Sequence, residues 1–115
     1  MGDSDRDLRK SIRDILSTLG SEERQLAYER AVPWVEITNE LVCMWFDDTY
    51  HPDDEDFRAH FSPAELAALA AFDALYDQRS KVLPEQPGTV RTWLASPAWR
   101  EIMQKARDTL ALLGN

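Results

Sequence analysis

FSPAEL, residues 61–66, is the strongest helix-start signal in the chain. Ser62 is a good helix cap, Pro63 suits the first helical position, and Glu65 lies where it completes a capping box. Apolar residues then recur at helical spacing as far as about Lys81. We therefore predict a well-capped helix over this stretch, with a buried stripe made of Leu66, Leu69, Phe72, Leu75 and Tyr76.

Three other stretches of the chain show helical spacing of apolar residues. The first spans about Asp5–Leu19, and Gly20 is expected to end it in the left-handed conformation. The second begins at Ser21 and is interrupted by Pro33, which either kinks a helix or begins a new one. The third runs from Ser96-Pro97 to Leu113, preceded by a short helical turn over Thr89–Ala95.

Residues 34–46 are ambiguous, because Val, Ile, Trp and Phe are common there and favour strands. A hairpin at 34–46 would make the fold α+β, and this is the minor alternative. The polar residues favour a helix, since Glu36, Glu40, Cys43 and Asp47 are spaced by four, three and four residues and form one stripe. We predict an all-α fold, a single-domain bundle of four to five helices over residues 1–115.

The charge of the chain excludes some partners. Its 115 residues carry a net charge of −8, and residues 21–60 alone hold eleven acidic and three basic residues. Direct binding to nucleic acid or to an anionic membrane is not expected, because phosphates are contacted mainly by Lys and Arg. The longest apolar runs, residues 41–46 and 66–72, are too short to span a bilayer. With one cysteine and no secretory signal, we expect a cytoplasmic, bacterial type of protein.

The sequence holds no constellation of catalytic or metal-binding residues. His51 and His60 are nine residues apart, which is not a metal-ligand spacing on a helix. Cys43 has acidic neighbours on its stripe, Glu40 and Asp47, which suppress the reactive thiolate. No nucleophile elbow or phosphate-binding glycine loop occurs. We predict a protein that is not an enzyme, with no catalytic residues, no metal and no cofactor.

Four tryptophans are many for a chain of this length. All four are expected to fill the core of a small bundle. The alternative is that one or two lie at an interface, and Trp93 is then the candidate for exposure.

The acidic cluster is the sharpest functional feature, because six of the ten residues 47–56 are Asp or Glu. It could be a solvated loop that maintains solubility, or a face that docks a basic protein, with aromatic side chains as anchors. We favour the second interpretation. The predicted binding residues are Glu36, Glu40, Asp47, Asp48, Tyr50, Asp53, Asp54, Glu55, Asp56 and Phe57.

This pattern favours a small inhibitor of the immunity type that neutralises a basic partner such as a toxin. One alternative is a regulatory adaptor or nucleic-acid mimic that blocks a DNA- or RNA-binding protein. Another is a helical protein that binds a small molecule, and a homodimer through the wide apolar face of residues 34–46 also fits the pattern.

Overall fold

The computed structural model describes residues 2–32, 37–83 and 89–113, with side chains from Leu8 onward. The described residues are helical without any strand, which confirms the all-α prediction. The hairpin alternative is wrong for Ile37–Thr49, and Trp34 and Glu36 lie outside the described residues. The elements are α1 (Gly2–Leu19), α2 (Glu22–Ala31), α3 (Ile37–Cys43), the π-helix η1 (Met44–Thr49), α4 (Glu55–Ala59), α5 (Pro63–Ser80), α6 (Val90–Leu94) and α7 (Pro97–Leu112).

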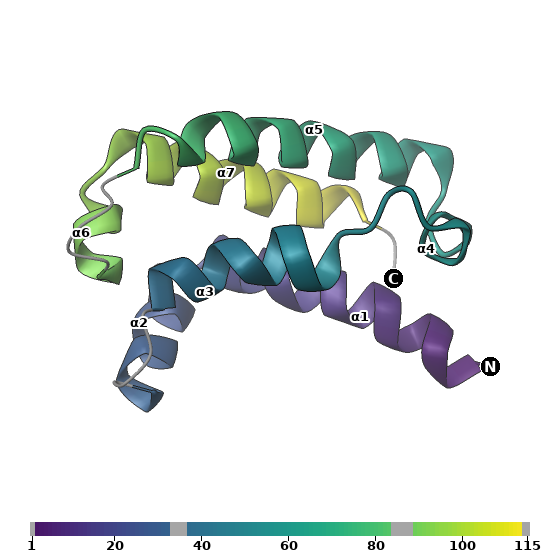
Figure 1. Ribbon diagram of the computed structural model, residues 1–115, viewed down its shortest axis with the longest axis horizontal. Helices are drawn as coiled ribbons and strands as arrows, with labels where there is room; N and C mark the ends of the chain where they lie inside the picture. The colour runs from purple at the N-terminus through teal and green to yellow at the C-terminus, as the bar shows by residue number, and fades with distance from the viewer. Residues whose placement is uncertain (1, 33–36, 84–88, 114–115) are drawn as a thin grey trace.

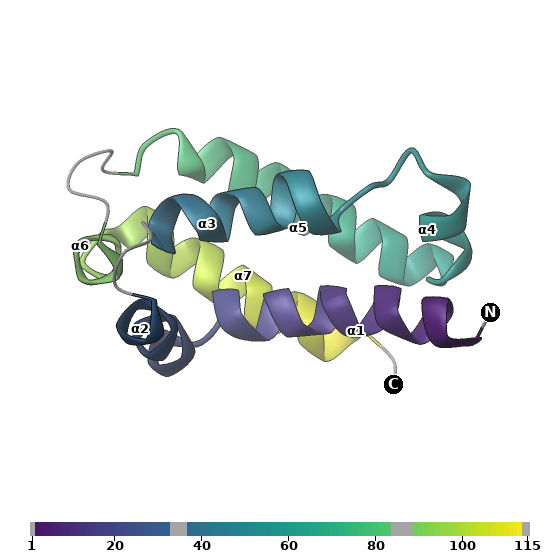
Figure 2. The same cartoon turned by 60° about the horizontal axis from the view of Figure 1, so that its bottom comes forward.

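The long helices lie roughly along one direction (Figures 1 and 2). Helix α7 packs against both α5 and α1, and α1 also contacts η1. The short helices α2 and α6 contact each other at one end of the molecule, and α4 lies at the opposite end (Figure 1). The acidic cluster, residues 47–56, begins within η1 and ends in the first turn of α4.

Aromatic rings connect the two sides of the core. Trp45 of η1 lies 4.8 Å from Phe72 of α5, measured between ring centroids, and Tyr76 on the same helix lies 6.1 Å from Trp99 of α7. Trp93 packs 4.7 Å from Trp99 and is only 7% exposed, so its predicted core position is confirmed and the alternative of an exposed Trp93 is wrong. Its helix, α6, buries Trp93 as an inward anchor instead of presenting it to solvent.

The predicted capping box at the start of α5 is present. The Ser62 hydroxyl accepts a hydrogen bond from the Glu65 amide at 3.1 Å, and the Glu65 carboxylate accepts one from the Ser62 amide at 2.8 Å. Glu65 has a second role that the sequence did not indicate. Its two oxygens each accept a bond from the Arg9 guanidinium at 3.1 Å, which joins α5 to α1. Glu65 therefore stabilises both the helix start and the packing of two helices.

We expect Ser62→Ala to lower the free energy of unfolding by about 0.5–2 kcal/mol, the usual effect of losing an N-cap. Glu65→Ala is expected to lower it by more, about 2–3 kcal/mol, because it also leaves a partly buried Arg9 without its bidentate partner. Urea denaturation of the two variants measures both effects. Equal effects, or a smaller one for Glu65→Ala, would show that the Arg9 pair contributes nothing.

Gly20 directly follows α1, as predicted, but glycine is present there for a different reason. The residue does not adopt the left-handed conformation, and it is required by close packing. A Cβ atom added there would lie 2.7 Å from Cγ of Arg107 on α7, and the Arg107 guanidinium donates a hydrogen bond to the Gly20 carbonyl at 2.7 Å. Glycine lets the two helices approach closely at this point.

Candidate protein-binding face

The π-helix η1 positions the first part of the acidic cluster. It continues α3 and ends with a bond from the Tyr50 amide to the Trp45 carbonyl, 3.0 Å long. Trp45 is fully buried, whereas Asp47 and Asp48 are exposed on the other side. Segments of π-helix are rare and are often found at functional sites.

The second part of the cluster is the start of a helix, where the sequence predicted a loop. Asp54 caps α4 by accepting a hydrogen bond from the Asp56 amide at 3.0 Å. Glu55 and Asp56 occupy the first turn, where the helix dipole favours negative charge. The cap and the helix dipole of α4 therefore account for the acidic residues at 54–56 without any binding function.

The acidic side chains of this segment are exposed and have no ion-pair partner among the described residues. Glu40 is half-buried, and no acidic residue in 47–56 forms an ion pair with any described residue. The nearby Arg58 donates instead to the Pro52 carbonyl at 2.7 Å, and the His60 ring donates to the Asp56 carbonyl. The exposed acidic residues are Asp47, Asp48, Asp53, Asp54, Glu55 and Asp56, and we call them the acidic face; Glu36 lies outside the described residues.

The two aromatic residues predicted as binding anchors are part of the core, and this expectation is corrected. Phe57 is 1% exposed and Tyr50 is 8% exposed. Tyr50 stacks on Trp45 with centroids 4.8 Å apart, and Phe57 contacts Tyr50 edge-on at 5.6 Å. Burial, followed by the charges of Asp73 and Asp53, raises the pKa of Tyr50. Substituting either ring would test the stability of the fold rather than an interface.

Asp73 on α5 is a neighbour of the acidic face that the sequence analysis missed. Its carboxylate accepts a hydrogen bond from the Trp45 indole at 3.0 Å and so joins α5 to η1. The signal that could have found it is the spacing of Asp73 and Asp77, four residues apart on the helix predicted to run from Ser62 to about Lys81.

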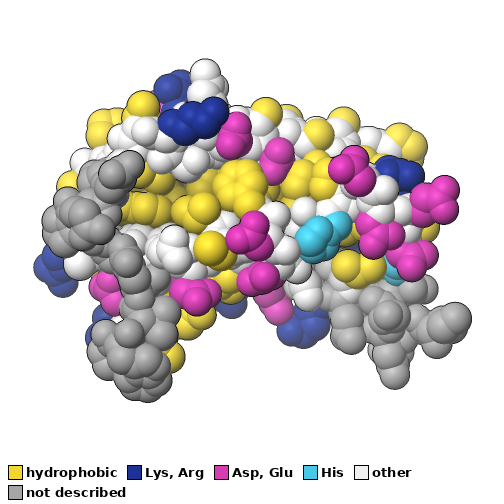
Figure 3. Space-filling view, viewed as in Figure 1, with side chains coloured by type: hydrophobic (Ala, Val, Ile, Leu, Met, Phe, Trp, Pro, Cys, Tyr) yellow, Lys and Arg dark blue, Asp and Glu magenta, His cyan; other side chains and the backbone are white. Residues whose placement is uncertain are grey.

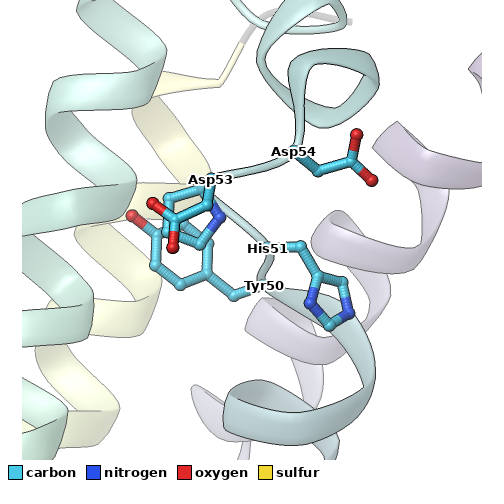
Figure 4. Close-up of a pocket in the computed structure, with 5 residues that line it drawn as sticks. Tyr50, His51, Asp53 and Asp54 are labelled. Atoms are coloured by element: carbon cyan, nitrogen blue, oxygen red, sulfur yellow. The ribbon is translucent and has the colours of Figure 1, made fainter.

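A shallow depression lies beside the acidic face (Figure 4). The Asp53 carboxylate lies beside the Tyr50 ring, whereas His51 and Asp54 project away from it (Figure 4). A ligand site would direct several polar groups inward, which this arrangement does not do. Within the described ranges, no three His, Cys, Asp or Glu side chains are grouped so as to hold a metal ion. No described helix is long and apolar enough to cross a membrane.

Cys43 lies at the edge of the acidic residues. Burial, the charge of Asp47 and a hydrogen bond to Asp47 raise the pKa of its thiol, with smaller effects from Glu40 and Asp48. Glu40 and Asp47, predicted from their spacing to share a stripe with Cys43, therefore lie close enough to the thiol for their charges to raise its pKa.

We expect Cys43 to react slowly with iodoacetamide at neutral pH, because a raised pKa leaves less thiolate than in a free thiol. The rate should increase as the pH rises beyond the ordinary thiol range, and Asp47→Asn should increase it at neutral pH. Mass spectrometry of the time course measures this. Alkylation of the wild-type protein as fast as that of a free thiol would contradict the electrostatic argument.

Comparison of the chain with protein-family models, curated proteins and solved structures found no match to any of them.

Proposed function

We propose that this chain is a non-enzymatic binding protein of the immunity type, which docks and neutralises a basic protein such as a toxin in the cytoplasm. The acidic face carries the proposal. Its six carboxylates are exposed and have no ion-pair partner within the described residues.

The rest of the described surface supports the proposal by contrast, because four of the six other exposed acids, Asp14, Glu22, Asp77 and Glu101, have basic partners. Glu23 and Asp108 form no ion pair with a described residue. Glu101 pairs with Arg79 at 2.8 Å, and Glu22 pairs with Arg100 at 3.0 Å. Charges that need only keep a protein soluble are usually interspersed in this way. Six carboxylates without such partners on one short segment create a local negative potential that attracts a basic partner over long range.

The acidic face also lies on a rigid support, which a docking surface requires. Asp54 is fixed as the cap of α4, and η1 is held by the buried ring of Trp45. A partner would therefore meet carboxylates carried on an ordered backbone, with little backbone entropy to lose on binding.

The experiment is a pull-down from the native host at low salt, with three baits. The first is the wild-type protein, and the second carries Asp53→Asn, Asp54→Asn, Glu55→Gln and Asp56→Asn; asparagine retains the cap of α4. The third is a control with the same change of charge at exposed acids elsewhere: Asp14→Asn, Glu23→Gln, Glu101→Gln and Asp108→Asn.

We expect the wild-type protein and the control to capture the same basic protein, and the acidic-face variant to lose it. Inhibition of that protein's activity by the wild-type chain would support the immunity assignment. Equal capture by all three baits, or capture of acidic proteins only, would overturn the proposal. A captured protein that binds DNA or RNA, without toxicity, would favour the regulatory mimic instead.

A further inference from the structure

An apolar seam lies between α3–η1 and α5. Its accessible part is formed by the half-buried Val42, Cys43 and Phe46, and the buried ring of Tyr76 lies beneath them. The Phe46 and Tyr76 rings lie 5.0 Å apart and bridge the two helical segments. Figure 3 shows an apolar strip along this line, with acidic side chains on both of its sides.

Beneath the seam lies a polar group without a partner. The Tyr76 side chain is fully buried, and its hydroxyl has no hydrogen-bond partner among the described residues. The Tyr76 ring contacts Phe46, which places this side chain on the side of α5 that faces the seam. Burial, followed by the charge of Cys43, raises the pKa of the Tyr76 hydroxyl. Buried hydroxyls are nearly always hydrogen-bonded, so Tyr76 is an exception directly beneath the seam.

Both sides of the seam carry carboxylates. Glu40 and Asp47 lie on the α3–η1 side, seven residues and thus about two helical turns apart. Asp73 and Asp77 lie on the α5 side, about one turn apart. Lys81 is 3.5 Å from Asp77, but both side chains are largely exposed, so this pair is weak and replaceable.

We infer that the seam binds a basic amphipathic helix of the protein partner. The apolar side chains of that helix would pack on Phe46 and Val42, and its Lys or Arg side chains would lie near the carboxylates on both sides of the seam. This inference rests on the proposed function and names the element that the partner contributes. An amphipathic helix in an apolar groove is a common mode of recognition. A second copy of the chain is a poor occupant of the seam, because both copies carry a net charge of −8 and would repel each other. An anionic membrane is repelled for the same reason.

Cys43, the one cysteine of the chain, lies in the seam and reports whether the seam is covered. The probes are two synthetic peptides of identical lysine and leucine composition. One places its leucines on a single helical face, and the other has a scrambled order. The alkylation rate of Cys43 by N-ethylmaleimide is measured in the full chain at alkaline pH, together with the affinity of each peptide.

The amphipathic peptide is expected to slow alkylation about ten-fold at a concentration about ten times its Kd, because only unbound protein reacts. The scrambled peptide should leave the rate nearly unchanged. Val42→Lys should weaken the amphipathic peptide, whereas neutralising residues 53–56 should weaken both peptides to a similar extent. If Val42→Lys disrupts the fold, as judged by circular dichroism, the protection of wild-type Cys43 still decides the question.

Tight binding of the amphipathic peptide without protection of Cys43 would overturn the inference. Protection that grows with protein concentration alone would also overturn it, since the seam would then be covered by a second copy. If the acidic-face variant loses the basic partner while the partner leaves wild-type Cys43 reactive, the proposed function stands and the seam assignment fails. If the partner protects Cys43 but binds the acidic-face variant unchanged, the seam assignment stands and the proposed role of the acidic face fails.

Discussion

Replacing Gln25 by leucine is expected to lower the free energy of unfolding by about 3 kcal/mol or more, since several buried polar groups lose their partner. Gln25 is fully buried on α2. Its amide nitrogen donates to the carbonyls of Thr18 and Leu19, each at 3.0 Å, and its oxygen accepts from the Trp99 indole at 3.0 Å. One side chain thereby connects α1, α2 and α7.

Urea denaturation followed by tryptophan fluorescence measures the effect. Gln78→Leu on α5 is the matched control, because Gln78 is exposed and its replacement should change stability by less than about 0.5 kcal/mol. Combining Gln25→Leu with Trp99→Phe should cost less than the sum of the single changes, since removing both partners leaves no unpaired indole. Strict additivity would mean that the bond from Trp99 to Gln25 contributes nothing.

The features that the sequence predicted well are local. The capping box of Ser62 and Glu65 needs only four consecutive residues, so it could be predicted without knowledge of the fold. The buried stripe of α5 follows in the same way from helical spacing: Leu69, Phe72 and Tyr76 are buried as predicted, and Leu66 and Leu75 are half-buried. Gln25 shows the limit of such reasoning. Its partner Trp99 lies 74 residues away, and no local pattern marks a polar residue as buried.

The candidate site was predicted for its charges but not for its aromatic residues. The exposure of the carboxylates could be predicted from the number of acidic residues in the segment, because charged side chains without a partner remain in contact with water. Tyr50 and Phe57 were assigned to the surface because of their acidic neighbours, yet the π-helix and the start of α4 turn both rings into the core. Asp73 lies near the site because α5 packs beside η1, where Asp73 accepts a hydrogen bond from Trp45. The residue pattern in 34–56 does not predict this packing.

Neutralising Asp53, Asp54, Glu55 and Asp56 together is expected to slow association with the proposed basic partner by about 10- to 100-fold at low salt. The four side chains are exposed, so they act mainly by long-range attraction during approach, and dissociation should change much less. The association rate of the variant should also depend less on salt, since fewer charges are left to be screened. Folding should be nearly unchanged, because the Asp54→Asn side chain can still cap α4 and repulsion among neighbouring carboxylates is relieved.

Stopped-flow or surface plasmon resonance measurements at several salt concentrations separate these effects. The control variant, neutralised at Asp14, Glu23, Glu101 and Asp108, has the same net charge and should associate nearly as fast as the wild-type protein. A slow variant beside a fast control would show that the position of the charges matters, and not only the total of −8. If both variants slow association equally, net charge alone steers the partner. If neither does so at low or moderate salt, the acidic face serves only solubility and the cap of α4.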